Sequence, residues 1–178
     1  MDTLCEDAET GCCPRFDPEP WDGKEHVWQD KLFLKDHVTS FLHIPLNFGK
    51  VIVRDMEKIQ KADALTPEPL MLSDERSSWG SDVYIAVTKD VPGAEMARIS
   101  GTFLTKVFEG PFKDTGKWMK EMETFISRHL SSTKEGGIPP EAGKSRGKEA
   151  KKIYCYYTTC PGCAKHYGKN YVVLVAQV

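Results

Sequence analysis

The amino-acid sequence predicts an α+β fold in which duplicated β-α-β-β units form one mainly antiparallel sheet, with two helices on one face and a ligand cleft on the other. Two amphipathic patterns, at 47–62 and 112–130, predict one helix in each unit. Short apolar runs precede and follow each pattern and predict the strands. The last run, at 171–178, is apolar at nearly every position, so we expect a central strand covered on both faces.

The first unit occupies residues 37–87. A strand is expected at 37–46, where Pro45 ends it. Apolar residues at helical spacing then predict the helix, namely Phe48, Ile52, Met56 and Ile59. Two further strands are expected at 69–72 and 82–87.

The second unit repeats this order of elements. A strand at 101–110 precedes the helix at 112–130, which carries Trp118, Met122 and Phe125 on one line. Strands at 153–159 and 171–178 complete the unit. The two units share their pattern alone, because no sequence repeat links them.

Outside these units the sequence loses its periodicity. Residues 1–25 hold several prolines and few regular apolar positions, so we expect an extended N-terminal coil that Phe16 and Trp21 could pin to the domain. Residues 26–178 are expected to form one α+β domain. Within it, residues 131–152 are rich in Gly, Pro, Lys and Ser and predict a mobile internal loop.

Composition excludes several classes of protein. A chain of 178 residues suffices for one domain with its own core. The 24 basic and 26 acidic residues leave a net charge of −2, which argues against nucleic-acid binding through bulk charge. No apolar run reaches the roughly 20 residues of a membrane span. The N-terminus is acidic and polar, unlike a signal peptide, so we expect a cytoplasmic protein whose six cysteines are thiols or metal ligands before disulfides.

The segment KVFEGPFKDTGKWMKEMETFI, with Gly110, Pro111 and Phe112 between strand and helix, resembles the signature of GyrI-like small-molecule-binding domains. YYTTCP and YVVLVAQV are similar to that family's aromatic strand and last strand. The family comprises the effector-binding domains of multidrug-responsive regulators and their stand-alone relatives. The resemblance covers roughly residues 37–178, and no helix-turn-helix precedes the domain.

This resemblance implies an aromatic cleft that takes flat and often cationic compounds. It also implies a glutamate near the start of the last strand, where this sequence has Lys169, Asn170 and Tyr171. Some GyrI-like relatives are hydrolases of reactive cyclopropane-bearing compounds. We therefore expect a stand-alone binding protein for small planar hydrophobic compounds, cationic ones included, with hydrolysis of strained-ring electrophiles as the alternative.

Aromatic residues are the candidate ligand-binding groups. Tyr154 and Tyr156 alternate on one face of their strand, opposite Tyr157. Flat molecules and cations stack on such rings. Four further aromatic residues could line the same cleft, namely Trp79, Tyr84, Phe108 and Tyr171. The alternative interpretation is that these rings fill the core, which is the more common environment of Phe.

Glu109 is the candidate catalytic residue, because it ends a strand directly before Gly110 and could act as a general base. The alternative is a solvated carboxylate at a strand end. The loop with Asp74 and Glu75 supplies a second acidic candidate, or a plain surface turn. No cofactor is required by either expected function.

The turn Cys160-Pro161-Gly162-Cys163 should bring two sulfurs within a few ångströms of each other. Tetrahedral zinc needs two more ligands, which Cys12 and Cys13 could offer if the N-terminal coil crosses the turn, with His166 as another candidate. A redox role needs the first cysteine at a helix start, whereas we expect a strand-to-strand loop. Unmodified thiols in a tight turn are the remaining interpretation.

Overall fold

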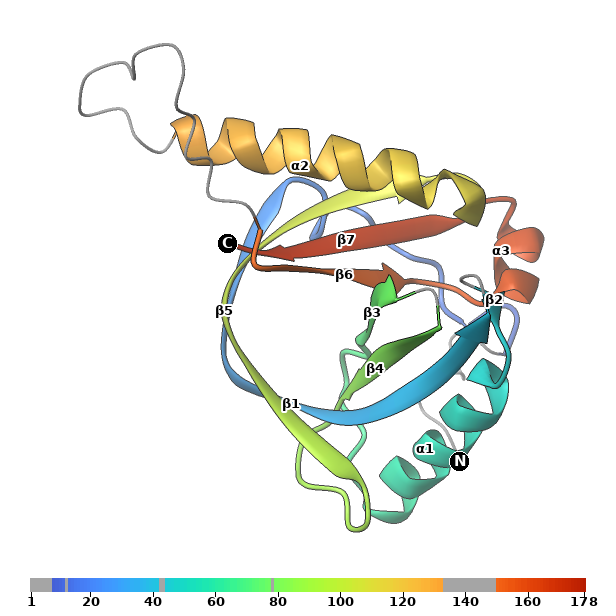
Figure 1. The fold of residues 1–178 in the computed structure, drawn as a ribbon. Helices are drawn as coiled ribbons and strands as arrows, with labels where there is room; N and C mark the ends of the chain where they lie inside the picture. Colours follow the sequence, from blue (N-terminus) through green and yellow to red (C-terminus); the bar gives the residue numbers. More distant parts are fainter. Residues whose placement is uncertain (1–7, 12, 42–43, 78, 133–149) are drawn as a thin grey trace.

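The structure, a computed structural model, describes residues 8–11, 13–41, 44–77, 79–132 and 150–178. Within these residues it contains seven strands and three α-helices, which confirms the predicted α+β class (Figure 1). The strands are β1 (Lys24–Phe41), β2 (Ile44–Pro45), β3 (Met71–Ser77), β4 (Gly80–Ala86), β5 (Glu95–Glu109), β6 (Lys152–Tyr157) and β7 (Tyr171–Gln177). The helices are α1 (Phe48–Lys61), α2 (Thr115–Ser132), which follows a 3-10 turn at Phe112–Asp114, and α3 (Pro161–Tyr167).

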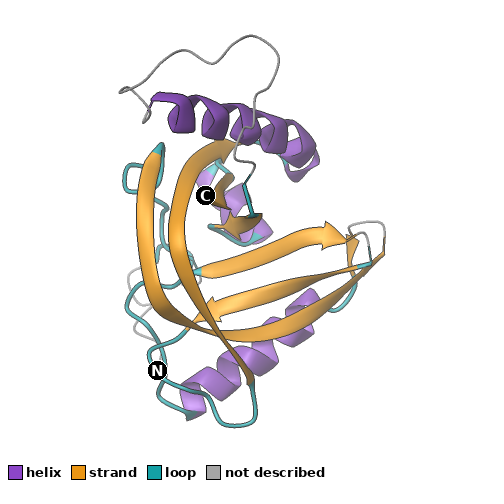
Figure 2. Cartoon of the chain, turned by 60° about the vertical axis from the view of Figure 1, so that its left-hand side comes forward, coloured by secondary structure: helices purple, strands orange, loops and turns teal. Residues whose placement is uncertain are grey.

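Hydrogen bonding between β1 and β5 closes the sheet into a ring of six strands in the order β1-β4-β3-β6-β7-β5 (Figure 2). Every pairing in the ring is antiparallel, as predicted, and β2 is attached to β1 outside it. The ring corrects the expectation of an open sheet with a cleft on one face, because a closed sheet has an inner and an outer surface instead. The duplication of β-α-β-β units stays a prediction.

Two irregular positions accompany the bending of β1 and β5. The register of β1 against β5 shifts between Trp28 and Lys31, and Asp30 has a positive φ of 47°. In β5, Gly101 has a φ of 143°, and a Cβ there would lie 2.9 Å from Nε2 of Gln177. Such a bulge and such a glycine increase the local bend of a strand, so each of these strands can pair with two neighbours.

The strand β1 is the largest departure from the expected elements. Its first part, residues 24–36, had no predicted structure, because charged side chains and the shifted register interrupt a simple alternation. The expected strand at 37–46 ends at Phe41, and the chain forms β2 at Ile44–Pro45.

The C-terminal part departs from expectation at one segment. Residues 161–167 form α3, where a loop was expected. The expected mobile loop at 131–152 falls largely on residues 133–149, which lie outside the described residues, and Lys152 already belongs to β6.

The ring is filled by one apolar cluster that draws on all six of its strands. Its buried members are Trp28, Phe33, Leu70, Leu72, Tyr84, Ala86, Ile99, Phe103, Tyr154, Val173 and Val175. Each strand of the ring alternates between this cluster and the outer surface, so Phe103 points inward and Leu104 outward. Burial of apolar surface, at about 25 cal/mol per Å², is the main force that holds the ring together.

Both long helices cover the outer surface of the ring, at well-separated places (Figure 1). The apolar side of α2 packs on β5 and β7 through Trp118, Met122 and Ile126. The helix α1 packs on β1 and β4, where Ile59, Leu34 and Ile85 belong to one apolar cluster. The central residues of β7 are buried from both sides, as predicted. None of the helices in the described residues is long and apolar enough to cross a membrane.

The inside of the ring also holds an ion pair. Lys152 Nζ lies 2.8 Å from Asp74 Oδ2, and the two side chains are 20% and 7% exposed. The same ammonium donates to the Tyr84 hydroxyl at 3.3 Å and lies 4.7 Å from the ring centre of Tyr154. Burial disfavours the charged lysine, but the bond to Asp74 and the two tyrosines outweigh it, so the pKa of Lys152 is raised.

This ion pair predicts a large difference between single and double substitutions. Lys152→Met leaves the Asp74 carboxylate buried without its ammonium, and we expect the free energy of unfolding to fall by about 3 kcal/mol. Adding Asp74→Leu removes both charges and should recover most of that loss. Urea denaturation of the three proteins measures both effects, and an equal loss in the single and double variants would contradict the prediction.

Candidate functional site

The N-terminal segment, residues 13–23, lies across one end of the ring, which we call the mouth. The Thr105 hydroxyl donates to the Trp21 carbonyl at 2.5 Å, and Asp22 accepts from the Val107 N–H at 3.1 Å. Phe16 and Trp21 pack against the inner apolar cluster, so the prediction that they pin this segment is confirmed.

Aromatic side chains from this segment and from the ring surround a cavity of about 480 Å³, the mouth pocket. Its rings come from Phe16, Trp21, His26, Trp28 and Tyr156. The ring centre of Trp21 lies 5.4 Å from that of Tyr156 and 4.9 Å from that of His26. Phe16 meets Tyr156 edge-on at 6.2 Å. Aromatic side chains that pack on one another therefore form much of the pocket wall.

His26 is the polar group of interest in this pocket. Burial, and then the nearby charge of Lys31, lower its pKa against the opposing effect of a hydrogen bond with the Pro20 backbone. Its Nε2 is buried and has no hydrogen-bond partner among the described residues. His26 is thus a neutral imidazole at pH 7 with an acceptor nitrogen that the fold leaves unused.

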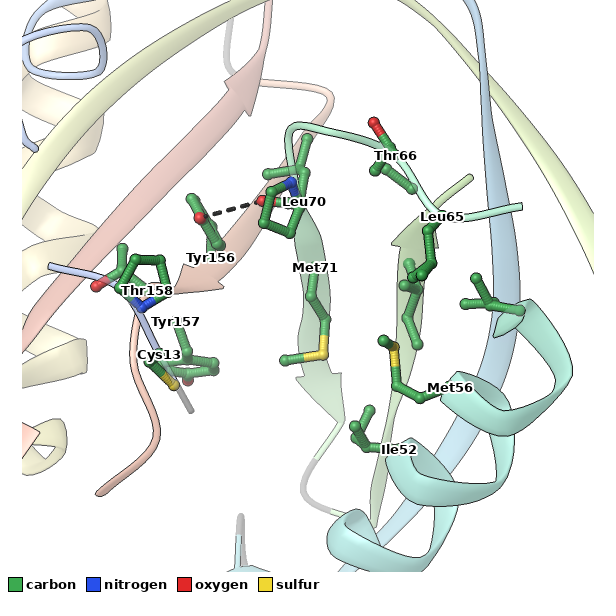
Figure 3. A pocket seen from close by; sticks show the side chains of 15 residues that line it. Cys13, Ile52, Met56, Leu65, Thr66, Leu70, Met71, Tyr156, Tyr157 and Thr158 are labelled. Carbon is green, nitrogen blue, oxygen red and sulfur yellow. Dashed lines mark hydrogen bonds between the residues drawn. The ribbon is translucent and has the colours of Figure 1, made fainter. Parts of the chain in front are cut away.

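A second cavity, the outer pocket, lies outside the ring beside α1 and has a volume of about 250 Å³ (Figure 3). Ile52, Met56 and Met71 supply apolar side chains to it, and Cys13 lies at its opposite side. Tyr156 borders both pockets and donates its hydroxyl to the Pro69 carbonyl at 3.4 Å. Burial raises the pKa of Tyr156 to about 12, so it remains a hydroxyl donor at neutral pH.

Three cysteine sulfurs meet where the N-terminal segment crosses α3. The Sγ atoms of Cys13, Cys160 and Cys163 all lie within 4.8 Å of one another. This confirms the expected closeness of Cys160 and Cys163 and the approach of Cys13, while Cys12 lies outside the described residues. The Thr10 hydroxyl, followed by contacts with Cys160 and Cys13, lowers the pKa of Cys163 to about 7.

The helix α3 positions two of these sulfurs and corrects the expected loop. Cys160 is its N-cap residue, and its sulfur accepts the Cys163 N–H at 3.5 Å. Pro161 follows in the first turn, and Gly168 ends the helix with a φ of 68°. Proline near a helix start and glycine after its end are the usual signals of a helix, so the sequence contained the evidence for α3.

The ring separates the expected ligand-binding residues. Tyr84 and Tyr154 lie inside it with ring centres 5.7 Å apart, beside the ion pair of Lys152. Tyr156 reaches the mouth pocket, and Tyr171 meets Phe16 at 5.6 Å. Tyr154 and Tyr156 both point into the ring, as expected for residues on one face of a strand. Tyr154 is buried there and Tyr156 only partly so.

The other expected residues lie elsewhere. Phe108 is on the outer surface, stacked on Trp118 at 5.7 Å. Trp79 is 66% exposed in the connection between β3 and β4. Glu109 is 51% exposed and lies 3.7 Å from Lys169. Glu75 belongs to β3, so its segment is a strand instead of a surface turn. Its carboxylate accepts a hydrogen bond from the Tyr157 hydroxyl at 2.5 Å.

His26 was missed at the sequence level, as was the role of Trp28. Both belong to the part of β1 for which no strand was expected, so their directions could not be assigned. The sequence signal that could have revealed them is the series of β-favouring residues in HVWQDKLFL, which charged residues interrupt.

The lowered pKa of His26 predicts a pH-dependent term in the stability of the protein. As the pH falls through the ordinary histidine pKa of 6.5, His26 binds a proton in the unfolded chain but stays unprotonated in the folded chain, where its pKa is lower. The free energy of unfolding should therefore decrease below about pH 6.5, and His26→Gln should reduce this decrease. Denaturation curves across this range test it, with His166→Gln as the exposed control. Identical slopes for the wild type and His26→Gln would contradict it.

Comparison with known proteins places the chain in a family. A family model described as "Bacterial hydrolase" matches residues 3–136 and 140–178. Two solved structures, "a hydrolase from Listeria innocua" and "an uncharacterized conserved protein from Listeria innocua", each align with a TM-score of 0.53 and 14% identity, covering 86% of this chain and 90% of that chain. At this identity the likeness shows a shared fold. No curated protein matches the sequence.

The resemblance to GyrI-like domains stays a prediction. The hydrolase family model, in contrast, matches almost the full length, including the cysteine-bearing segments near both ends. The chain therefore belongs to the bacterial hydrolase family.

Proposed function

We propose that the protein binds a small, planar, largely apolar molecule in the mouth pocket. The observation that carries this proposal is the convergence of Phe16, Trp21 and Tyr156, from two distant parts of the chain, around one cavity of about 480 Å³. Cavities of roughly 300–1,000 Å³ are typical of small-molecule sites, and flat molecules gain stacking energy on such rings.

The polar groups of the mouth pocket narrow the class of ligand. His26 lines the pocket, and its buried Nε2 has no hydrogen-bond partner among the described residues, so a ligand that donates an N–H or O–H would satisfy it after the side chains that cover Nε2 move. Two basic side chains, Arg15 and Lys31, and two acidic ones, Asp17 and Glu68, line the pocket. Because these charges balance, the proposed ligand is a neutral planar molecule with a hydrogen-bond donor, although cationic compounds were also expected from the sequence.

The proposal predicts saturable binding of neutral aromatic compounds that carry a donor, such as hydroxylated or amino-substituted bicyclic probes. Titration followed by tryptophan fluorescence should give a Kd that rises about 10-fold in Tyr156→Ala, because a stacked ring is lost. His26→Phe keeps a ring but removes the acceptor, so it should weaken donor-bearing probes more than their methylated analogues.

Val53→Ala is the matched control, since Val53 is an exposed apolar residue on α1. It should leave the Kd unchanged. Absence of saturable binding across the probes, or equal binding by wild type and Tyr156→Ala, would contradict the proposal.

Hydrolysis is the second candidate, and the neutral His26 in the pocket is the structural observation that favours it. After the side chains that cover Nε2 move, a water beside it could attack a ring carbon of a strained cyclic ether. The C–O bond at that carbon breaks, the proton of the water passes to Nε2, and the opened ring oxygen takes a proton from solvent. Membership of the bacterial hydrolase family and the Listeria innocua hydrolase add support to this reaction class. Glu109, the base expected from the sequence, does not line either pocket.

Turnover of a panel of aromatic epoxides tests this candidate. If His26 is the base, His26→Gln should lower kcat by about 100-fold or more, while binding of the unreactive diol product persists. Glu109→Gln should retain full turnover. The opposite pattern, loss in Glu109→Gln and retention in His26→Gln, would overturn the assignment of the base.

A further inference from the structure

We infer that Cys13, Cys160 and Cys163 bind one zinc ion and that this ion fastens the N-terminal segment to α3. The inference is independent of the proposed ligand, because it rests on the sulfurs and on the backbone around them. The three sulfurs come from the two ends of the chain, and all lie within 4.8 Å of one another.

The spacing fits a metal centre better than a disulfide. Zinc–sulfur bonds of about 2.3 Å at tetrahedral angles place the sulfurs of one site about 3.8 Å apart. A disulfide joins only two sulfurs, at about 2.05 Å, and therefore does not account for a third sulfur nearby. Here three sulfurs lie within 4.8 Å of one another. The fourth position of the tetrahedron is left for one further donor.

The surrounding hydrogen bonds favour sulfur in its thiolate form. The backbone N–H of Cys160 donates to Cys13 Sγ at 3.4 Å, and that of Cys163 donates to Cys160 Sγ at 3.5 Å. Donors aimed at sulfur stabilise the negative charge that a metal ligand must carry.

Cys155 shows by contrast what an unused cysteine looks like in this protein. It is buried under α2 in the outer apolar cluster, and burial raises the pKa of its thiol to about 12. It behaves as a small apolar residue of the core. The same chain therefore provides a matched control thiol outside the proposed site.

The site has a clear structural consequence. The Tyr167 hydroxyl donates to the Cys13 carbonyl at 2.6 Å, and the Arg15 guanidinium lies 4.7 Å from the centre of the Tyr167 ring. These contacts hold the start of a segment of weak intrinsic structure, next to the three sulfurs. A zinc ion would add a strong link between this segment and α3, just before Phe16 and Trp21 reach the mouth pocket.

Metal content of the full-length protein, purified without chelator from zinc-supplemented cells, tests the inference. We expect about one zinc ion per chain in the wild type and in Cys155→Ala, and near zero in Cys13→Ser, Cys160→Ser and Cys163→Ser. Because a serine variant could fail to fold, cobalt titration of the reduced, metal-free wild type provides a second readout. It should give an intense thiolate-to-cobalt band at one equivalent, which zinc then displaces.

Two results would overturn the inference. One is a zinc-free wild type in which Cys160 and Cys163 react freely with a thiol reagent and cobalt gives no thiolate band. The other is a Cys160–Cys163 disulfide, found by mass spectrometry in metal-free protein purified without reductant. Zinc content is measured without any aromatic probe, so failure here is distinguishable from failure of ligand binding in the mouth pocket.

Discussion

The pairing of β1 with β5 joins residues 24–35 to residues 95–105 and turns a six-stranded sheet into a closed ring. A closed sheet has no free strand edge, and its inward side chains must fill the space that they enclose. Large aromatic side chains such as Phe33 and Phe103 fill the interior of the closed sheet. At the mouth the ring's own side chains leave space, and the N-terminal segment crosses it. The mouth pocket follows from that arrangement.

The polar groups inside the ring differ in whether the fold supplies them with hydrogen-bond partners. Asp74 is buried and Lys152 half-buried, and both are satisfied, because each neutralises the other and Tyr84 accepts a further hydrogen bond from Lys152. His26, closer to the mouth, keeps a buried Nε2 without a partner among the described residues. An unsatisfied buried acceptor costs about 1–3 kcal/mol, so folding alone does not favour it. The ion pair is accordingly satisfied within the fold, whereas His26 is the group to which the proposed ligand would donate.

Tyr156 links the parts of the candidate site. Its ring meets Phe16 and Trp21, its hydroxyl bonds to the Pro69 carbonyl, and it borders both pockets. The three-cysteine cluster lies at the start of the same N-terminal segment that carries Phe16 and Trp21. The mouth pocket and the three-cysteine cluster thus share one short stretch of chain, and whatever orders that stretch also shapes the pocket.

The sequence by itself determined the α+β class, the two amphipathic helices, the strand buried from both sides and the closeness of Cys160 and Cys163, because these depend on local periodicity and short spacing. It did not determine the closure of the sheet, because β1–β5 pairing joins segments about seventy residues apart, and bends at Trp28 and Gly101 obscure the alternation of β1 and β5. Closure then decided that Tyr84 and Tyr154 lie inside the ring, that Phe108 is buried on its outer side under α2, and that His26 lies in a pocket. Only the tertiary structure could make those assignments. Alternation along a strand shows which side chains share a face, but only the closed sheet shows which face is enclosed.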